Sequence, residues 1–157
     1  ILRAALRALK YQGVRSIGII LGKMWGRKIF SQTKKTEELF ILRPPLLIPL
    51  PLHPRRQRAR GFNQSLEITK GIAAITAWPI SKDLKRLSYQ APSAHSSYQT
   101  RLKQKKIFFH QAANLQDRTI FLVDDVVTTG ATANHAAQAL RQAGAKDIII
   151  ASIAQSL

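Results

Sequence analysis

One string near the C-terminal end of the chain constrains its fold more than any other feature. Residues 120–123 are apolar and rich in β-branched and aromatic types, and Asp124 and Asp125 follow at once. Such a run predicts a buried strand that ends on two adjacent carboxylates. Residues 128–132 then lead into a segment whose apolar residues recur at helical spacing, which predicts a helix. Its inner face is Ala133, Ala136, Ala137 and Leu140.

This order of elements places the small-residue loop where an anion can bind. At the carboxyl end of a strand in an open α/β sheet, loop N–H groups and a helix N-terminus converge on a ligand. A phosphate beside Asp124 and Asp125 would be repelled unless the acids bound hydroxyls or a divalent cation. A sugar phosphate supplies hydroxyls, and Mg²⁺ prefers carboxylate and phosphate oxygens. The alternative is that the two acids only cap the following turn.

Residues 120–132 resemble the phosphoribosyl pyrophosphate (PRPP) binding motif of type I phosphoribosyltransferases. The resemblance implies that Asp124 and Asp125 meet the ribose 2′- and 3′-hydroxyls and hold Mg²⁺ mainly through the substrate. It also implies a loop that wraps the 5′-phosphate. The loop residues are Thr128, Thr129, Gly130, Ala131 and Thr132.

Length and composition favour one globular domain over residues 1–157, because 45% of the residues are hydrophobic. Cysteine is absent, which excludes disulfides, thiolate metal sites and cysteine nucleophiles. The four histidines show no ligand spacing, so we expect no zinc. No apolar run is long enough to span a membrane and no secretory signal is evident, so we expect a cytoplasmic protein. The chain begins with Ile1, which leaves room for an upstream segment.

The net charge is the strongest compositional signal. The chain has 25 Lys and Arg against 8 Asp and Glu, a formal charge of +17. Such a surplus favours a polyanionic partner, and single-stranded DNA is the candidate. The alternative is that a few of the basic residues serve PRPP and its pyrophosphate while the others are solvated surface.

Two amphipathic stretches open the chain. Residues 2–9 carry an apolar stripe opposite basic side chains, and residues 14–30 follow the same pattern, so both predict helices. The expected inner face of the second helix is Ile17, Leu21 and Met24. Basic amphipathic helices can lie on membranes, but packing against a core is the commoner use. Between the helices, Gly13 permits unusual backbone angles near a ligand.

The middle of the chain combines a strand with a dense run of arginines. Residues 46–52 predict a second short buried strand, ended by prolines. Residues 55–60 pack four arginines into six positions, and we predict a loop there whose charges phosphate would neutralise. Asn63 is the expected cap of the next helix. Leu66, Thr69, Ile72 and Ala73 are its expected inner face.

Residues 51–64, preceded by Leu-Lys-Tyr-Gln-Gly and followed by the PRPP motif, resemble the ComF (ComFC-like) competence proteins over about residues 6–154. The resemblance implies a role in DNA uptake during natural transformation, with a competence-machinery protein or a second copy as protein partner. It implies a pyrophosphate loop that contains Lys10, Tyr11 and Gly13. It also implies a signature loop beside the site. Its residues here are Arg55, Arg56, Arg60, Asn63 and Gln64.

Two features depart from the family pattern. Many relatives begin with a four-cysteine zinc ribbon, and this sequence has no cysteine. The family tends to show Arg-x-x-Asn after a glutamine, whereas here Arg101 is followed by Gln104, which lengthens the amide side chain. Residues 88–100 show no periodicity and predict a loop that can close over PRPP. Basic and aromatic residues alternate on its flanks, as they do on surfaces that bind single strands.

The remaining patterns complete an α/β fold. Asp117 and Arg118 predict a turn, Gly144 ends the helix that begins after residue 132, and residues 148–153 predict another buried strand. Strands that alternate with helices predict a mostly parallel sheet flanked by helices. The resemblance adds a type I phosphoribosyltransferase-like topology with a small hood and a flexible loop.

Two functions of different classes follow. The first is a phosphoribosyltransferase, in which an acceptor displaces pyrophosphate from PRPP, with Lys10, Asp124 and Asp125 as catalytic residues. Lys10 with an arginine from 55–60, or Arg101, would receive the pyrophosphate, and the acceptor is unknown. The second is a non-catalytic PRPP or nucleotide sensor that holds DNA. A basic membrane-surface protein is a third, weaker alternative.

Overall fold

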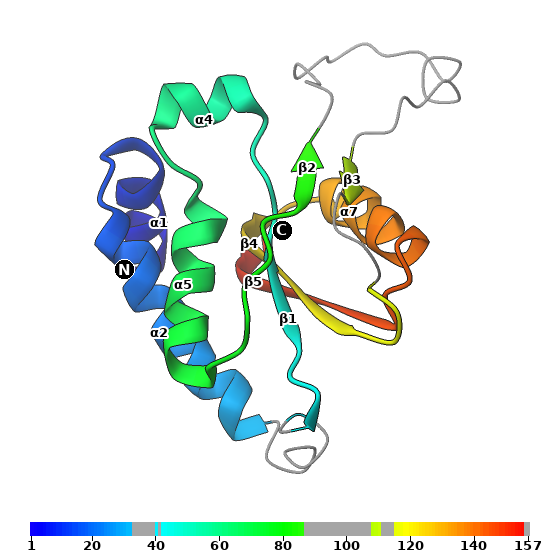
Figure 1. Ribbon diagram of the computed structural model, residues 1–157. Helices are drawn as coiled ribbons and strands as arrows, with labels where there is room; N and C mark the ends of the chain where they lie inside the picture. The colour runs from blue at the N-terminus through cyan, green and yellow to red at the C-terminus, as the bar shows by residue number, and fades with distance from the viewer. Residues whose placement is uncertain (33–39, 41, 87–107, 111–114, 156–157) are drawn as a thin grey trace.

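The computed structural model describes residues 1–32, 40, 42–86, 108–110 and 115–155, and Figure 1 shows the arrangement of their elements. Helices precede the first strand, and both strands and helices follow it. The elements are α1 (Leu2–Tyr11), α2 (Arg15–Gln32), β1 (Leu46–Pro49), α4 (Pro54–Arg60), α5 (Gln64–Thr76), β2 (Leu84–Arg86), β3 (Phe108–His110), β4 (Thr119–Val127), α7 (Ala131–Gln142) and β5 (Asp147–Gln155).

The main sheet is parallel and has the order β1-β4-β5 in the described residues. Leu47 of β1 pairs with Phe121 of β4, and Phe121 pairs with Ile149 of β5. On the other edge of β1, the Leu47 N–H donates to the Pro79 carbonyl at 2.9 Å and the Ser81 N–H donates to the Leu47 carbonyl at 3.0 Å. β2 and β3 form a separate antiparallel pair. The predicted parallel sheet is therefore confirmed.

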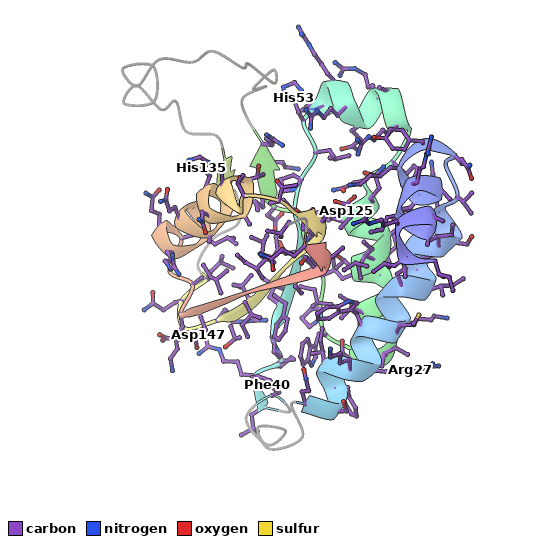
Figure 2. The ribbon with its side chains drawn as sticks, turned by 180° about the vertical axis from the view of Figure 1, so that it is seen from behind. Arg27, Phe40, His53, Asp125, His135 and Asp147 are labelled. Carbon is purple, nitrogen blue, oxygen red and sulfur yellow. The ribbon has the colours of Figure 1, made fainter. Side chains whose placement is uncertain are left out.

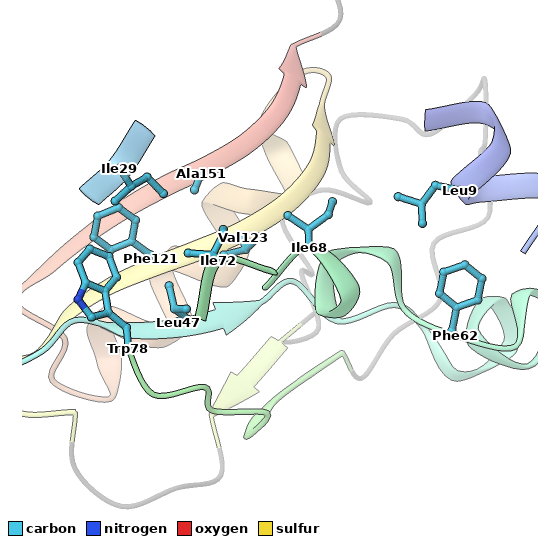
Figure 3. Close-up of a cluster of buried hydrophobic side chains, with 10 residues drawn as sticks. All are labelled: Leu9, Ile29, Leu47, Phe62, Ile68, Ile72, Trp78, Phe121, Val123 and Ala151. Atoms are coloured by element: carbon cyan, nitrogen blue, oxygen red, sulfur yellow. The ribbon is translucent and has the colours of Figure 1, made fainter. Parts of the chain in front are cut away.

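Alternate strand residues build a core on each face of the sheet, because successive side chains point to opposite sides. Leu47, Phe121 and Val123 pack against α5 in one core, and Figure 3 shows this cluster with Trp78 beside Phe121. Ile48, Ile120 and Leu122 pack against α7 in the other core. Each fully buried Leu or Ile contributes roughly 1.5–3 kcal/mol. Helices thus cover both faces, as Figure 1 shows.

The α7 prediction is confirmed in detail. Its buried residues are the four that the periodicity indicated, Ala133, Ala136, Ala137 and Leu140. The helix ends at Gln142, and Gly144 takes a φ of +96°, which glycine adopts without strain. The turn predicted at Asp117 is also present, and Asp117 itself has a φ of 56°.

The predicted inner face of α2 is only partly correct, because Ile17 is partly buried against the core whereas Met24 faces outward. Met24 is 61% exposed, and three glycines at every fourth position, Gly18, Gly22 and Gly26, are buried instead. A Cβ on Gly22 would collide with the Ile68 carbonyl oxygen of α5. The two helices pack so closely that the contact excludes side chains, and hydrophobic periodicity does not register a face made of glycine.

The arginine-rich segment is a helix, so the loop predicted there is wrong. α4 has Pro54 at its first position, and the His53 imidazole Nδ1 accepts the Arg55 N–H at 3.2 Å. Gly61 follows with a φ of +75° and ends the helix. A cap, an early proline and a C-terminal glycine outweigh the mutual repulsion of the arginines.

Three strand predictions need correction. β4 does not end at Asp124 but continues to Val127, because β5 pairs with it along this whole length. β1 ends at Pro49 rather than residue 52, since the prolines that follow cannot donate ladder hydrogen bonds. β5 is a strand, but it is not fully buried, because Ile149 and Ile150 are 42% and 41% exposed. In the described sheet β5 is an edge strand.

Candidate active site at the tip of the central strand

A cavity of about 190 Å³ lies at the carboxyl ends of β1 and β4. It brings together many of the residues that the sequence indicated, from α1, α4, β4 and the loop before α7. These are Lys10, Arg56, Arg60, Asp124, Asp125, Thr128, Gly130, Ala131 and Thr132. Parallel strands place their carboxyl ends at one edge of the sheet, which is why the cavity forms there.

Asp124 is partly buried, and its pKa is strongly perturbed. One oxygen, Oδ1, accepts the Ser65 hydroxyl at 3.1 Å and the Asp125 N–H at 2.8 Å. Burial, and then the neighbouring charge of Asp125, raise the pKa of Asp124 to about 7. The carboxyl therefore titrates near neutral pH, which is a property typical of functional sites.

Asp125 forms an ion pair with the first helix. Its Oδ2 lies 2.9 Å from the Lys10 ammonium, and its Oδ1 accepts the Val126 N–H at 2.9 Å. Lys10 reaches this position because Leu6 and Leu9 on the same helix are buried and fix its orientation. The lysine predicted for the pyrophosphate loop therefore lies beside the acid pair.

The loop before α7 presents backbone N–H groups that can donate hydrogen bonds to a ligand. Gly130 is the N-cap with a φ of +74°, and no side chain caps the helix. Among the described residues, no hydrogen bond uses the N–H of Thr128, Thr129, Gly130 or Thr132, and that of Ala131 makes only a 3.5 Å contact with Thr129 Oγ1. The acids bind other amides, so they do not cap this turn. Free N–H groups at a helix N-terminus are an anion site.

The signature residues after the arginines act as supports. Asn63 caps α5 as predicted, since its Oδ1 accepts the Ser65 N–H at 3.1 Å, and its Nδ2 donates to the Leu50 carbonyl at 3.1 Å. Gln64 is 1% exposed, and its Oε1 accepts a hydrogen bond from Arg60 Nη1 at 3.2 Å. Neither residue lines the cavity. They hold Ser65 and Arg60, which do.

Four other predicted residues do not line this cavity, namely Tyr11, Gly13, Arg55 and Thr129. All four are exposed, and Tyr11 is 74% exposed. Gly13 has a φ of +71° with open space around it, so the loop needs glycine for its conformation rather than for lack of room. Arg101 lies outside the described residues.

Two polar residues that line the cavity, Ser65 and Arg86, were not predicted as site residues by the sequence analysis. Ser65 lies in the first turn of α5, directly after the N-cap Asn63 and Gln64. Its place beside these two predicted site residues is the sequence signal that could have indicated it. Arg86 is half-buried, and its pKa is lowered by burial and then by the charge of Arg56. No local pattern indicates Arg86, because only the packing of β2 brings it to the site.

The fold and the site together define a phosphoribosyltransferase-like protein, and comparison with known proteins agrees. A family model described as "Phosphoribosyl transferase domain" matches residues 64–156. The chain therefore belongs to the phosphoribosyl transferase domain family. A solved structure of the allosteric regulatory enzyme of purine biosynthesis shares the fold, with a TM-score of 0.53 and 17% identity, over 89% of this chain and 26% of that chain.

Within this family, the chain is similar to competence proteins. Competence protein F of Haemophilus influenzae is 30% identical over 127 residues, which cover 78% of this chain and 55% of that protein. DNA utilization protein YhgH of Salmonella typhi is 33% identical over 116 residues, covering 73% of this chain and 51% of that protein. The chain spans about half the length of these relatives. The ComF-like resemblance is confirmed.

None of the described helices combines the length and the apolar character that crossing a bilayer requires.

Proposed function

We propose that this chain binds PRPP with Mg²⁺ at the tip of β4 and transfers the phosphoribosyl group to an acceptor. The observation that carries the proposal is a single cavity with unused loop N–H groups on one side and two adjacent acids on the other. The loop of residues 128–132 binds the 5′-phosphate, and Asp124 and Asp125 bind the ribose hydroxyls.

The carboxylate ligands present in the cavity suit Mg²⁺. Asp124 and Asp125 offer two carboxylates of the kind that Mg²⁺ takes, together with substrate oxygens. No group of three potential ligating His, Cys, Asp or Glu residues occurs in the described part of the chain, so PRPP completes the coordination. The Lys10 ammonium lies 2.9 Å from Asp125 Oδ2, which shows that a positive charge already accompanies this carboxylate in the free protein. When bound, Mg²⁺ neutralises charge that develops on the pyrophosphate.

The other residues of the cavity position the substrate and stabilise charge. As the bond between the anomeric carbon and pyrophosphate breaks, negative charge grows on the leaving group, and Lys10, Arg56 and Arg60 lie within the same cavity to meet it. Positive charge grows on the ribose beside Asp124 and Asp125. Positioning and electrostatics are therefore the contributions of this site.

A calorimetric titration tests the PRPP proposal. PRPP with Mg²⁺ should release heat with the wild type and much less with Asp124→Asn/Asp125→Asn. Asp147→Asn is a matched control, because Asp147 is exposed and lies at the opposite end of the sheet from Asp125, as Figure 2 shows. Absence of heat with the wild type would exclude PRPP binding. Release of pyrophosphate with a panel of bases distinguishes an enzyme from a non-catalytic PRPP sensor.

The proposed nucleic-acid partner is single-stranded DNA. The proposed role is in natural competence, in the cytoplasm. The proposed protein partner is a component of the competence machinery or a second copy of this chain. The net charge of +17 supports DNA as a partner, as do the names of the relatives. Residues 1–36 and 39–66 contain no Asp or Glu, so basic side chains in these stretches have no acidic neighbour within them. Retention of single-stranded DNA should fall steeply with salt, and a log–log slope near zero would refute DNA binding.

A further inference from the structure

A second cavity, of about 550 Å³, adjoins the PRPP cavity and has no assigned ligand. It lies between α4, the start of α5 and β2, and Figure 1 shows α4 and β2 at the same end of the molecule. Its volume is within the range of small-molecule sites, roughly 300–1,000 Å³. We call it the α4–β2 cavity. Its lining residues are Pro49, Pro51, Leu52, Pro54, Gln57, Arg58, Asn63, Leu66, Lys82, Leu84, Lys85 and Arg86.

The lining combines two kinds of side chain. Half of the lining residues are prolines and leucines, and four cations lie among them, Arg58, Lys82, Lys85 and Arg86. None of the lining residues is acidic. A purely apolar ligand would leave the cations unused, and inorganic phosphate would leave the apolar surface unused. The ligand that suits both is a flat ring joined to an anion.

The two cavities share a wall. Pro51, Leu52 and Arg86 line both of them, so a molecule in the α4–β2 cavity would lie beside the proposed PRPP site. Arg86 is half-buried between the two, where its charge can act on either ligand. Binding of one ligand can therefore change the affinity for the other.

We infer that the α4–β2 cavity binds one nucleotide unit of single-stranded nucleic acid, with its base on the apolar surface and its phosphate near the cations. The nucleotide site rests on the single-stranded DNA partner proposed above, and its adjacency to PRPP rests on the proposed PRPP site. A single strand fits better than a duplex, because an unpaired base can enter a pocket without the cost of breaking a base pair. Bases also stack on Arg guanidinium planes, which Arg58 can offer.

Two exposed lysines provide the test. Lys82→Glu/Lys85→Glu should weaken binding of a short oligothymidylate at least tenfold and reduce its log–log salt slope by about 0.7, which is the contribution of one single-strand phosphate. The heat of PRPP binding should stay within about twofold. Lys23→Glu/Arg27→Glu is the matched control, because it makes the same charge change at exposed positions of α2. It should weaken oligothymidylate binding less than threefold.

Competition by small molecules completes the test. Thymidine 5′-monophosphate should displace the oligonucleotide at lower concentration than inorganic phosphate or free thymine does. Equal loss of binding in the two double variants would mean diffuse surface attraction and would overturn the inference. Equal competition by inorganic phosphate would reduce the site to an anion site and would also overturn it. A wild type that binds no PRPP would refute the proposed function alone.

Discussion

Lys10 on the first helix and Asp125 on the central strand are joined by an ion pair of 2.9 Å, although they lie near opposite ends of the sequence. The contact links the helix that precedes the sheet to the tip of the strand at its centre. In the free protein, Lys10 balances part of the charge of the acid pair. A bound pyrophosphate would offer the same ammonium a second anionic partner.

Removal of this ammonium should weaken PRPP binding. Charge-assisted contacts contribute roughly 1.5–3 kcal/mol, so Lys10→Met should lower the affinity by roughly tenfold to a hundredfold. Methionine keeps most of the length of the side chain, which limits the change in packing. Calorimetry measures the loss, and Lys23→Met at an exposed position of α2 is the control. Equal affinities for Lys10→Met and the wild type would remove Lys10 from the site.

Replacement of Asp124 should stabilise the protein at alkaline pH. The raised pKa of Asp124, about 7 against 3.8, means that the folded state binds this proton more tightly than the unfolded state. Stability is therefore lost as the pH rises from about 4 through 7. Asp124→Asn keeps an oxygen for the Ser65 hydroxyl and removes this loss. We expect the variant to gain on the order of a few kcal/mol at pH 8 and little at pH 4.

Urea denaturation at pH 4 and pH 8 measures this difference in the free energy of unfolding. Asp147→Asn, at an exposed carboxylate, should show no such pattern. If Asp124→Asn proved less stable than the wild type at pH 8, the ionised carboxylate would stabilise the folded state. The interpretation that its burial destabilises the protein and serves ligand binding would then be wrong.

The affinity for PRPP with Mg²⁺ should increase with pH. Ligand binding needs the ionised Asp124, and a pKa of about 7 leaves only a small ionised fraction at pH 6. The apparent affinity scales with that fraction, so it should rise about tenfold between pH 6 and pH 8. Asp124→Asn lacks the titrating carboxyl, so the pH dependence of its residual affinity corrects for ionisation of PRPP itself. A flat profile, or a fall with pH, would contradict an essential Asp124 carboxylate.

The glycine contact between α2 and α5 should be intolerant of any side chain. A Cβ on Gly22 meets backbone atoms of α5, which cannot move aside as a flexible side chain can. Gly22→Ala should therefore destabilise the protein by roughly 1–3 kcal/mol or more. Ser16→Ala, at an exposed position of the same helix, should change stability by less than about 0.5 kcal/mol. A neutral Gly22→Ala in thermal denaturation would show that the two helices can separate without cost.

The sequence determined the features that depend on neighbouring residues. A strand, an acid pair, a small-residue loop and a helix follow one another within residues 120–142, so periodicity and loop composition indicate both the elements and the proposed phosphate-binding loop. The cap at Asn63 and the buried face of α7 are equally local. The extent of β4 beyond Asp124 is not a local property, because a strand extends as far as the neighbouring strand pairs with it.

Tertiary structure alone decided what surrounds the acid pair. In the sequence Lys10 comes before the first strand and Arg86 after it, and the Ser65 hydroxyl of α5 donates to Asp124 of β4. The glycine face of α2 exists only because α5 lies against it. Periodicity reports which side of an element is apolar, but not which distant element covers it. The ionisation of Asp124 is likewise a property of packing, because the burial that raises its pKa is supplied by the rest of the fold.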